Sequence, residues 1–396
     1  MNNRKEILQF LPEFLLVQSK VKHIIFKDKK LKTSYLIDII HNMLLKYYFK
    51  KDNRFIISSL VLKDKYGHLY NYYIQYLVEI GSIKMVKNYL KGNNSRIYSI
   101  DENILKNKIL RYKNTDKFLI KKLSIKHLQF ELTKSSIINR EIKEKLISDL
   151  YSVDIDFDRS ISYLDSLKKD DIDVYNRNKY SVESINNKNI FYHFDSYGRL
   201  HTNFTILKGF IRKNCLLIDS EETCEMDINN SQPLFLYKLI IESETKWVNK
   251  EELEIFSILV KNGNYYQYLI DKLNLKSKSE AKEVTYKVLF GQNRNNSKCD
   301  KLFRSIFPTI YNYIRLYKSE NKDYRVLAYD LQMAESKLIF NKIIKKIMSL
   351  NLDIKVITVH DSIIIQKKWK DIVSNIFFNE IFKHFNKNTN LEKIYN

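Results

Sequence analysis

Residues that shape or cross-link a backbone are scarce in this chain, which has three cysteines, three prolines and seven glycines among 396 residues. Cys215, Cys224 and Cys299 form no CxxC pair, which excludes a disulfide framework and a zinc site of the CxxC type. No apolar run approaches the ~20 residues that span a bilayer, and Glu6 and Glu13 interrupt the amino-terminal stretch where a secretory signal would be apolar. We therefore expect reduced thiols, no membrane partner and a cytoplasmic location, including the cytosol of a phage or mobile-element host or an AT-rich organelle.

Acidic residues are also few, with 46 Asp and Glu against 68 Lys and Arg, so the net charge is +22. Such a surface favours a polyanion, either nucleic acid or an acidic membrane face. The sequence is crowded with Lys, Ile, Asn and Tyr, as AT-rich coding gives, and this composition bias is the alternative source of the excess. The sequence lacks a basic amphipathic anchor for a membrane surface, so nucleic acid is the expected partner.

The first half of the chain is predicted to be mostly helical, beginning with a helical segment at residues 1–53. Apolar residues there recur at the i, i+3, i+4 spacing of a core-facing helix, at Leu36, Ile39, Ile40, Met43 and Leu44. Residues 106–190 are likewise expected to be helical, are strongly charged and contain no motif that carries chemistry.

Residues 54–105 have the outline of a winged-helix nucleic-acid-binding module. A helix ends at Gly81, which suits a left-handed C-cap, and two strand-like runs follow, joined by the turn sequence KGNN. In such a module the helix would enter the major groove while Lys87, Lys91 and Arg96 contact phosphates. Packing of a helix on a hairpin without any role in DNA binding is the open alternative.

Two strand-like segments in the second half each deliver one aspartate. The first, CEMDINNSQPLFLYKLI, runs into Asp227 and then into a helix with Pro233 in its first turn. The second, IKVITVHDSIIIQ, reads as a hairpin with Asp361 at its tip. An aspartate anion among apolar neighbours is costly unless it is paired or binds a cation, although unrelated turn aspartates are the alternative. Two such carboxylates in a basic protein suit phosphoryl transfer with two Mg²⁺ ions.

The segment SKSEAKEVTYKVLFGQ, which lies between the two aspartates, supplies cations and aromatic rings. Lys278, Lys282, Tyr286 and Phe290 follow one another at intervals of four residues, which places them along one helix face. Lys282 would hold phosphate, the two rings would pack against base and sugar, and Gly291 would end the helix. Taken alone, the segment also fits an ordinary amphipathic helix.

In chain order these segments resemble the family A DNA polymerases and the related single-subunit RNA polymerases of phages and mitochondria. DINNSQP looks like motif A, AKEVTYKVLFG like motif B of the fingers helix, and VHDS like motif C. The resemblance implies that Asp227, the carbonyl of Ile228 and Asp361 hold two Mg²⁺ ions, with Lys282 as a third catalytic residue. It covers about residues 191–370, roughly half of the chain.

The same resemblance implies contacts to the substrates. YGRLHTN is similar to the segment with a GR pair ahead of the palm, and LQMAESK to the helix ahead of motif C. The implied nucleotide-binding residues are Arg199, Gln232, Lys278, Lys282, Tyr286 and Phe290. The implied primer- or template-binding residues are Lys208, Arg212, Gln332 and His360.

Several departures from the family pattern leave the preferred sugar open. Ser231 and Gln232 stand one residue late in motif A, so that Gln232 takes the position of a sugar-discriminating glutamate. Motif C has Ser362 in place of a glutamate, as in the single-subunit RNA polymerases. No exonuclease motif set occurs in residues 1–190, so proofreading is not expected.

The resulting prediction is an α+β protein with a helical amino-terminal half, a thumb-like or connecting region at residues 106–190, and a polymerase-like palm and fingers at residues 191–396. We expect a monomeric, compact DNA-directed DNA polymerase that uses Mg²⁺, a DNA primer-template and nucleoside triphosphates. The alternatives are a single-subunit-type RNA polymerase or primase-like enzyme, and a non-catalytic DNA-binding replication protein with a vestigial palm.

Overall fold

The computed structural model describes residues 6–50, 53–56, 58–88, 96–106, 109–134, 136–169, 171–243, 245, 247–293 and 297–386. The chain forms two compact units, each assembled from separate stretches of sequence. Unit 1 comprises Met1–Glu131, Phe157–Ile190 and Ile206–Lys208, and unit 2 comprises Leu132–Asp156, Phe191–Thr205 and Gly209–Asn396. Both units combine helices with antiparallel strands, which is the α+β class. The division into residues 1–53, 54–105, 106–190 and 191–396 stays a prediction.

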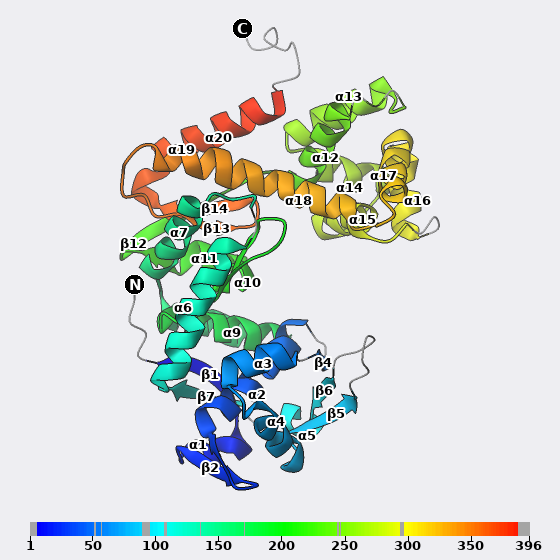
Figure 1. Ribbon diagram of the computed structural model, residues 1–396. Helices are drawn as coiled ribbons and strands as arrows, with labels where there is room; N and C mark the ends of the chain where they lie inside the picture. Colours follow the sequence, from blue (N-terminus) through cyan, green and yellow to red (C-terminus); the bar gives the residue numbers. More distant parts are fainter. Residues whose placement is uncertain are drawn as a thin grey trace. The chain divides into compact units, whose positions relative to one another are not determined.

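Unit 1 has a helical core with small sheets around it (Figure 1). Its helices are α1 (Leu16–Ser19), α2 (Thr33–Lys50), α3 (Ser59–Tyr66), α4 (Tyr70–Glu79), α5 (Glu102–Lys106), α6 (Lys117–Thr133, which ends inside unit 2), α8 (Phe157–Leu167) and α9 (Ile172–Asn186), with the 3₁₀ turn η1 (Glu13–Leu15). Its strands are β1 (Ile7–Pro12), β2 (His23–Phe26), β3 (Lys29–Lys32), β4 (Phe55–Ile56), β5 (Ile83–Lys87), β6 (Ile97–Ile100) and β7 (Ile109–Asn114).

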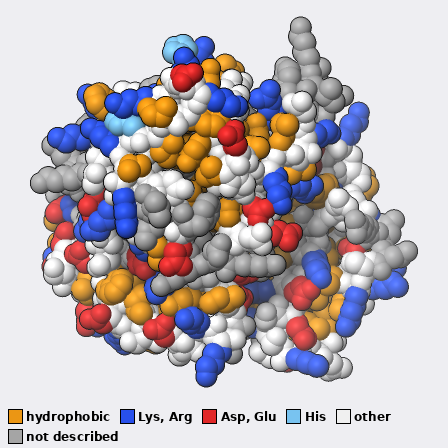
Figure 2. All heavy atoms as spheres, turned by 90° about the horizontal axis from the view of Figure 1, so that it is seen from below, with side chains coloured by type: hydrophobic (Ala, Val, Ile, Leu, Met, Phe, Trp, Pro, Cys, Tyr) orange, Lys and Arg blue, Asp and Glu red, His pale blue; other side chains and the backbone are white. Residues whose placement is uncertain are grey.

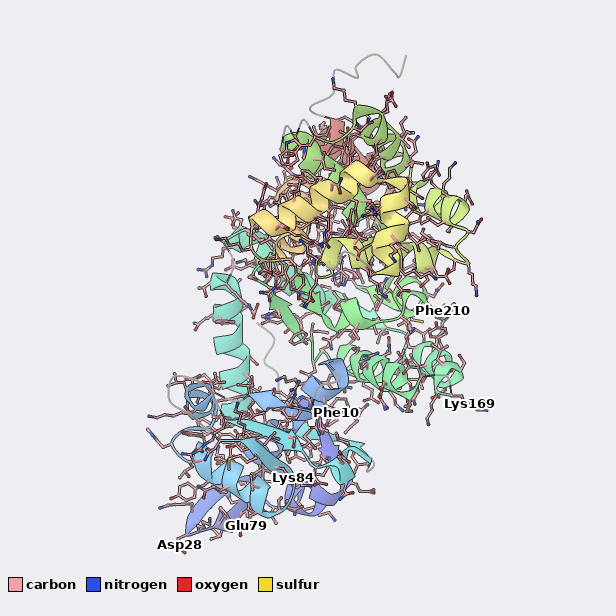
Figure 3. The ribbon with its side chains drawn as sticks, turned by 90° about the vertical axis from the view of Figure 1, so that its right-hand side faces the viewer. Phe10, Asp28, Glu79, Lys84, Lys169 and Phe210 are labelled. Carbon is pink, nitrogen blue, oxygen red and sulfur yellow. The ribbon has the colours of Figure 1, made fainter. Side chains whose placement is uncertain are left out.

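The apolar stripe predicted for the amino-terminal region is confirmed on α2. All five stripe residues are at most 3% exposed. Phe10 of β1, labelled in Figure 3, belongs to the same core, and β1 pairs with β7 from Ile7↔Asn114 to Pro12↔Ile109. Burial of this stripe fixes which face of α2 points inward.

The expectation that residues 1–53 are helical is wrong for the part before α2, where β1, β2 and β3 form. The β2–β3 hairpin turns through Lys27 and Asp28, which have φ values of 48° and 60°. A two-residue hairpin turn with both φ angles positive usually carries Asn or Gly, so the sequence gives no turn signal here. The strands β7 and β8 (Val153–Ile155) likewise correct the expectation of an all-helical segment at residues 106–190.

The helix and hairpin predicted between residues 54 and 105 are present as α4, β5 and β6. Gly81 follows α4 with a φ of 71°, which confirms the left-handed conformation expected after this helix. β6 pairs with β5 and also with β4, making a three-stranded sheet. The KGNN turn and Lys91 lie outside the described residues, and a winged-helix role stays a prediction.

Unit 2 contains a five-stranded antiparallel sheet with the order β13-β14-β12-β11-β8. These strands are β13 (Ile357–Val359), β14 (Ser362–Gln366), β12 (Glu221–Asp227), β11 (Leu216–Ile218) and β8, with β9 (Tyr192–Phe194) and β10 (Leu200–Thr202) forming a separate hairpin. β14 is buried along its whole length and β13 likewise, so the β13–β14 side of this sheet is core. The core strands hold the hairpin that carries Asp361.

Helices flank this sheet and form a second cluster beside it. They are α7 (Arg140–Asp149), α10 (Asn203–Ile206), α11 (Gly209–Asn214), α12 (Ser231–Glu242), α13 (Lys250–Lys261), α14 (Tyr265–Leu273), α15 (Lys278–Phe290), α16 (Lys298–Ile306), α17 (Pro308–Glu320), α18 (Val326–Leu338), α19 (Lys345–Met348) and α20 (Lys370–Asn386). The π-helical segment η3 (Ile339–Ile344) joins α18 to α19, and the 3₁₀ turns are η2 (Leu150–Ser152) and η4 (Lys367–Trp369). In Figure 1, α20 lies alongside the continuous helix formed by α18, η3 and α19, and α12 and α15 also pack on α18.

Candidate active site

The two predicted aspartates come together at one end of the β12–β14 pair. β12 ends at Asp227, whose register partner is Ser362, the first residue of β14. His360 and Asp361 form the two-residue turn between β13 and β14, and His360 has a φ of 55°. The backbone N–H of Ile228 donates to the carbonyl oxygen of Asp361 at 3.3 Å. Antiparallel pairing therefore makes neighbours of two carboxylates that are more than 130 residues apart in the sequence.

The carboxyl group of Asp361 is held in an environment that disfavours its charge. Burial, followed by the negative charges of Glu335 and Asp227, raises its pKa to about 7, against the opposing effects of a backbone hydrogen bond and of the charge of Arg199. Asp227 is exposed. The carboxyl groups of Asp227 and Asp361 repel each other when both are ionised, and a cation bound between them would reduce this repulsion.

Two carboxylates are groups of the kind that could hold Mg²⁺. In proteins Mg²⁺ is usually bound through one or two carboxylates plus the phosphates of a substrate, because it keeps several other oxygen ligands. Among the residues that the structure describes, no group of three or more His, Cys, Asp or Glu side chains is arranged to hold a metal ion. Asp227 and Asp361 are a pair and do not make up such a group by themselves.

A buried glutamate that the sequence analysis did not identify ties this site together. Glu335 on α18 is 1% exposed. Its Oε1 accepts from Arg199 Nη2 at 2.6 Å and from Arg199 Nε at 3.0 Å. Its Oε2 accepts from Ser231 Oγ at 3.0 Å and from Gln232 Nε2 at 2.5 Å. One carboxylate thus joins the loop before β10, the first turn of α12 and the last turn of α18.

The sequence did carry a signal for Glu335. Leu331, Glu335 and Leu338 are spaced i, i+4, i+7 on the buried face of α18, and a charge on an apolar stripe requires a partner. Its partners, however, lie at least 103 residues away in the chain. Arg199 and Gln232, which were predicted to contact the nucleotide, have their donors turned toward Glu335.

The helix predicted in the segment SKSEAKEVTYKVLFGQ forms as α15, with Ser277 as N-cap and its side chain accepting from the backbone of Glu280. The Nζ atoms of Lys282 and Lys278 lie 5.8 Å and 6.0 Å from the ring centroid of Tyr266 on α14. Cations at this distance from an aromatic face are attracted to it. Tyr266, which the sequence analysis missed, therefore holds both lysines on the same side of α15.

The aromatic residues of α15 also lie near the carboxylates. Tyr286 and Phe290 stack with ring centroids 5.4 Å apart. Burial raises the pKa of Tyr286, and the negative charges of Asp361 and Glu335 add to the rise. Tyr286 is 37% exposed, so its ring is accessible beside the anionic site. The face with lysines and rings and the pair of aspartates thus belong to one neighbourhood of unit 2.

The end of α15 confirms one prediction and corrects its reason. The helix ends at Phe290, but Gly291 has an extended backbone rather than the left-handed conformation expected of a C-cap glycine. A Cβ atom on Gly291 would lie 2.3 Å from the carbonyl oxygen of Lys287, so close approach of the backbone demands glycine. The buried ammonium of Lys318 donates to the carbonyls of Val288 at 2.6 Å and Gly291 at 2.9 Å, and burial lowers its pKa to about 8.

The residues assigned to primer and template are spread more widely. Removal of the His360 imidazole from water and the charges of Arg199 and His201 lower its pKa to about 4. Gln332 is half-buried on α18, and Arg212 Nε lies 3.4 Å from Glu225 Oε1.

Three other assigned residues belong to unit 1. Lys208 is exposed, and so are Lys87 on β5 and Arg96, which precedes β6. None of the three belongs to the cluster around Asp361.

No family model matches the sequence, and no curated protein does. Among solved structures, the POL domain of Pol1 from M. smegmatis, in complex with DNA primer-template and dNTP, is similar with a TM-score of 0.31 and 13% identity. The match covers 56% of this chain and 52% of that chain, so this chain spans about half of its length. At this level of similarity the match assigns neither a family nor a function. None of the described helices is long and apolar enough to cross a membrane.

Proposed function

We propose that unit 2 carries the active site of a template-directed nucleotidyltransferase, a compact DNA-directed DNA polymerase without proofreading. The observation that carries this proposal is the convergence of Asp227 and Asp361 at adjacent strand ends, beside a helix that presents two lysines and two aromatic rings. Paired carboxylates, cations and accessible rings are the groups that a nucleoside triphosphate requires: metal ligands, phosphate donors and a stacking surface.

The residues of the pair would hold Mg²⁺ through the side chains of Asp227 and Asp361 and the carbonyl of Ile228. Two bound ions would supply activation of the attacking hydroxyl and compensation of charge on the departing pyrophosphate. Asp361, with a pKa of about 7, is ready to exchange a proton for a cation near neutral pH.

The chain's own cations would orient the triphosphate. Lys282 and Lys278 are exposed on α15 and would donate to phosphate oxygens, while the stack of Tyr286 and Phe290 would pack on the base and sugar. Arg199, fixed by Glu335, would direct its remaining guanidinium N–H groups toward the nucleotide. On this proposal the implied primer and template contacts within unit 2 are those of His360, Gln332 and Arg212, and the enzyme acts as a monomer on DNA.

Use of ribonucleotides is the second candidate, and two observations favour it. Gln232 points its amide at Glu335, and the Ser362 hydroxyl has Glu225 Oε1 and the carbonyl of Val359 as its two possible acceptors. Neither position of the two motifs presents a carboxylate to the sugar, so the steric and electrostatic basis for excluding a 2′-hydroxyl is absent at these two positions.

A primer-extension matrix tests the proposal. DNA and RNA primers on a DNA template are each incubated with dNTPs or NTPs and Mg²⁺, with a reaction containing EDTA as control. We expect extension of the DNA primer with dNTPs; extension with NTPs alone would select the second candidate. Failure of all four combinations, under conditions where the protein binds the primer-template, would favour a non-catalytic DNA-binding protein.

A further inference from the structure

A strongly basic β-hairpin projects from unit 1 and shares no residue with the candidate active site. We call it the basic hairpin: it comprises β2, β3 and the residues that lead into them. Its six lysines are Lys20, Lys22, Lys27, Lys29, Lys30 and Lys32. Asp28, labelled in Figure 3, marks its tip. Figure 2, which looks at this end of the molecule, shows Lys and Arg side chains gathered toward the upper left of the face.

Most of this charge is uncompensated. Lys32 Nζ pairs with Asp116 at 3.0 Å, and Lys27 Nζ lies 3.9 Å from Glu79. Within the part of the chain that the structure describes, no ion pair involves the other four lysines: Lys20, Lys22, Lys29 and Lys30. All four are exposed. Four uncompensated cations in eleven residues make a concentrated positive potential.

The hairpin is a firm support for these charges. Phe26 is 8% exposed and Leu31 is fully buried, so one face of the hairpin is anchored in the core of unit 1. The backbone N–H of Lys32 donates to the hydroxyl of Tyr73 at 3.0 Å. Because the side chains alternate between faces, anchoring of Phe26 and Leu31 leaves the opposite face to solvent.

That opposite face combines lysines with apolar side chains. Ile25 is 71% exposed and is the register partner of Lys30. Val21, next to Lys22, is 49% exposed. Partial removal from water and the charges of Lys30 and Lys22 lower the pKa of His23, which is the first residue of β2.

We propose that the basic hairpin is a docking surface for the sugar-phosphate backbone of duplex DNA. Lysines bind phosphate as point charges, and their binding to DNA is independent of sequence and weakens as the salt concentration rises. The exposed side chains of Ile25 and Val21 fit the apolar sugar edges between phosphates. Lysines on a strand edge also discourage pairing with other chains, and this is the alternative reason for their presence here.

The test compares two triple variants of the full chain with equal charge. K22Q/K29Q/K30Q removes three lysines of the basic hairpin, and K250Q/K345Q/K346Q removes three exposed lysines of unit 2; each lowers the net charge from +22 to +19 (22 − 3). Binding of a fluorescent duplex is followed by anisotropy over a range of salt concentrations. Loss of three phosphate contacts should make the slope of log K against log salt shallower by about 2.7, since each contributes about 0.9. We expect at least a tenfold loss of affinity at low salt for the hairpin variant and less than a threefold loss for the control.

Equal weakening of both variants would overturn the proposal, because net charge alone would then explain binding. Unchanged binding of the hairpin variant would overturn it as well. A variant that binds the duplex normally but loses binding to vesicles rich in phosphatidylserine would assign the surface to a membrane instead. The readout requires no catalysis, so failure of the polymerase proposal and failure of this one are distinguishable.

Discussion

Replacing Asp361 by asparagine should stabilise the protein in the absence of metal while removing its activity. The structure raises the pKa of this carboxyl from 3.8 to about 7. The folded state therefore binds the proton more tightly than the unfolded state does. Between about pH 4 and pH 7 the folded state holds more protons, so the free energy of unfolding falls as the pH rises through this window.

The magnitude follows from the same values. The shift is about 3 pKa units, and each unit corresponds to about 1.36 kcal/mol, so ionised Asp361 costs the folded protein about 4 kcal/mol at most above pH 7. Asparagine has nearly the same shape and no charge. Asp361→Asn should therefore raise the free energy of unfolding at pH 8 by about 2–4 kcal/mol, and by close to nothing at pH 4.

Urea unfolding in EDTA, followed by tryptophan fluorescence at pH 4, 6 and 8, measures this difference. Both tryptophans, Trp247 and Trp369, lie in unit 2, so the signal reports the unit that contains Asp361. Asp353→Asn is the matched control: the partner Lys355 lowers the pKa of this exposed carboxyl, so its replacement should not stabilise the protein at pH 8. Asp361→Asn with no gain at pH 8, or with an equal gain at pH 4, would refute the reasoning.

Three further predictions concern neighbouring residues. The first is a double-mutant cycle of Arg199→Ala and Glu335→Ala measured by urea unfolding. Either single replacement already breaks the buried charge-assisted pair, so the coupling energy should be about 1.5–3 kcal/mol. Additive effects would show that the pair contributes nothing. Gly291→Ala should lower the free energy of unfolding by about 1–3 kcal/mol through the clash of its Cβ with the Lys287 carbonyl, whereas Gly209→Ala, with nothing within 4 Å, should be neutral or slightly stabilising. Lys282→Ala should reduce kcat/KM for nucleotide about ten- to hundred-fold, while Lys287→Ala, whose ammonium pairs with Glu283 at 2.5 Å, should behave nearly as the unaltered protein; the reverse result would mean that the register of α15 is misassigned.

The parts of the site that the sequence revealed are those whose signals are local. Asp361 follows the β-branched strand ITV, and Asp227 stands just before a helix with proline in its first turn, so local sequence patterns identify both carboxylates. The four-residue spacing from Lys278 to Phe290 likewise predicts a helix with one functional face.

Glu335, Tyr266 and Lys318 escaped prediction because their meaning depends on contacts across the fold. Glu335 meets Ser231 from 104 residues away and Arg199 from 136, and no local pattern encodes such distances. The amino-terminal strands were missed for a different reason, since the β2–β3 turn uses Lys27 and Asp28 where positive φ angles usually call for glycine or asparagine.

The central claim, that Asp227 and Asp361 form a metal-dependent nucleotidyl-transfer site, is tested most directly by paired measurements on Asp227→Ala and Asp361→Ala. Extension of a DNA primer with dNTPs and Mg²⁺ is measured alongside anisotropy binding of the same primer-template. We predict undetectable extension for both variants, with binding retained or slightly tighter because a negative charge has left the site. Extension at a rate near that of the unaltered protein by either variant would contradict the claim.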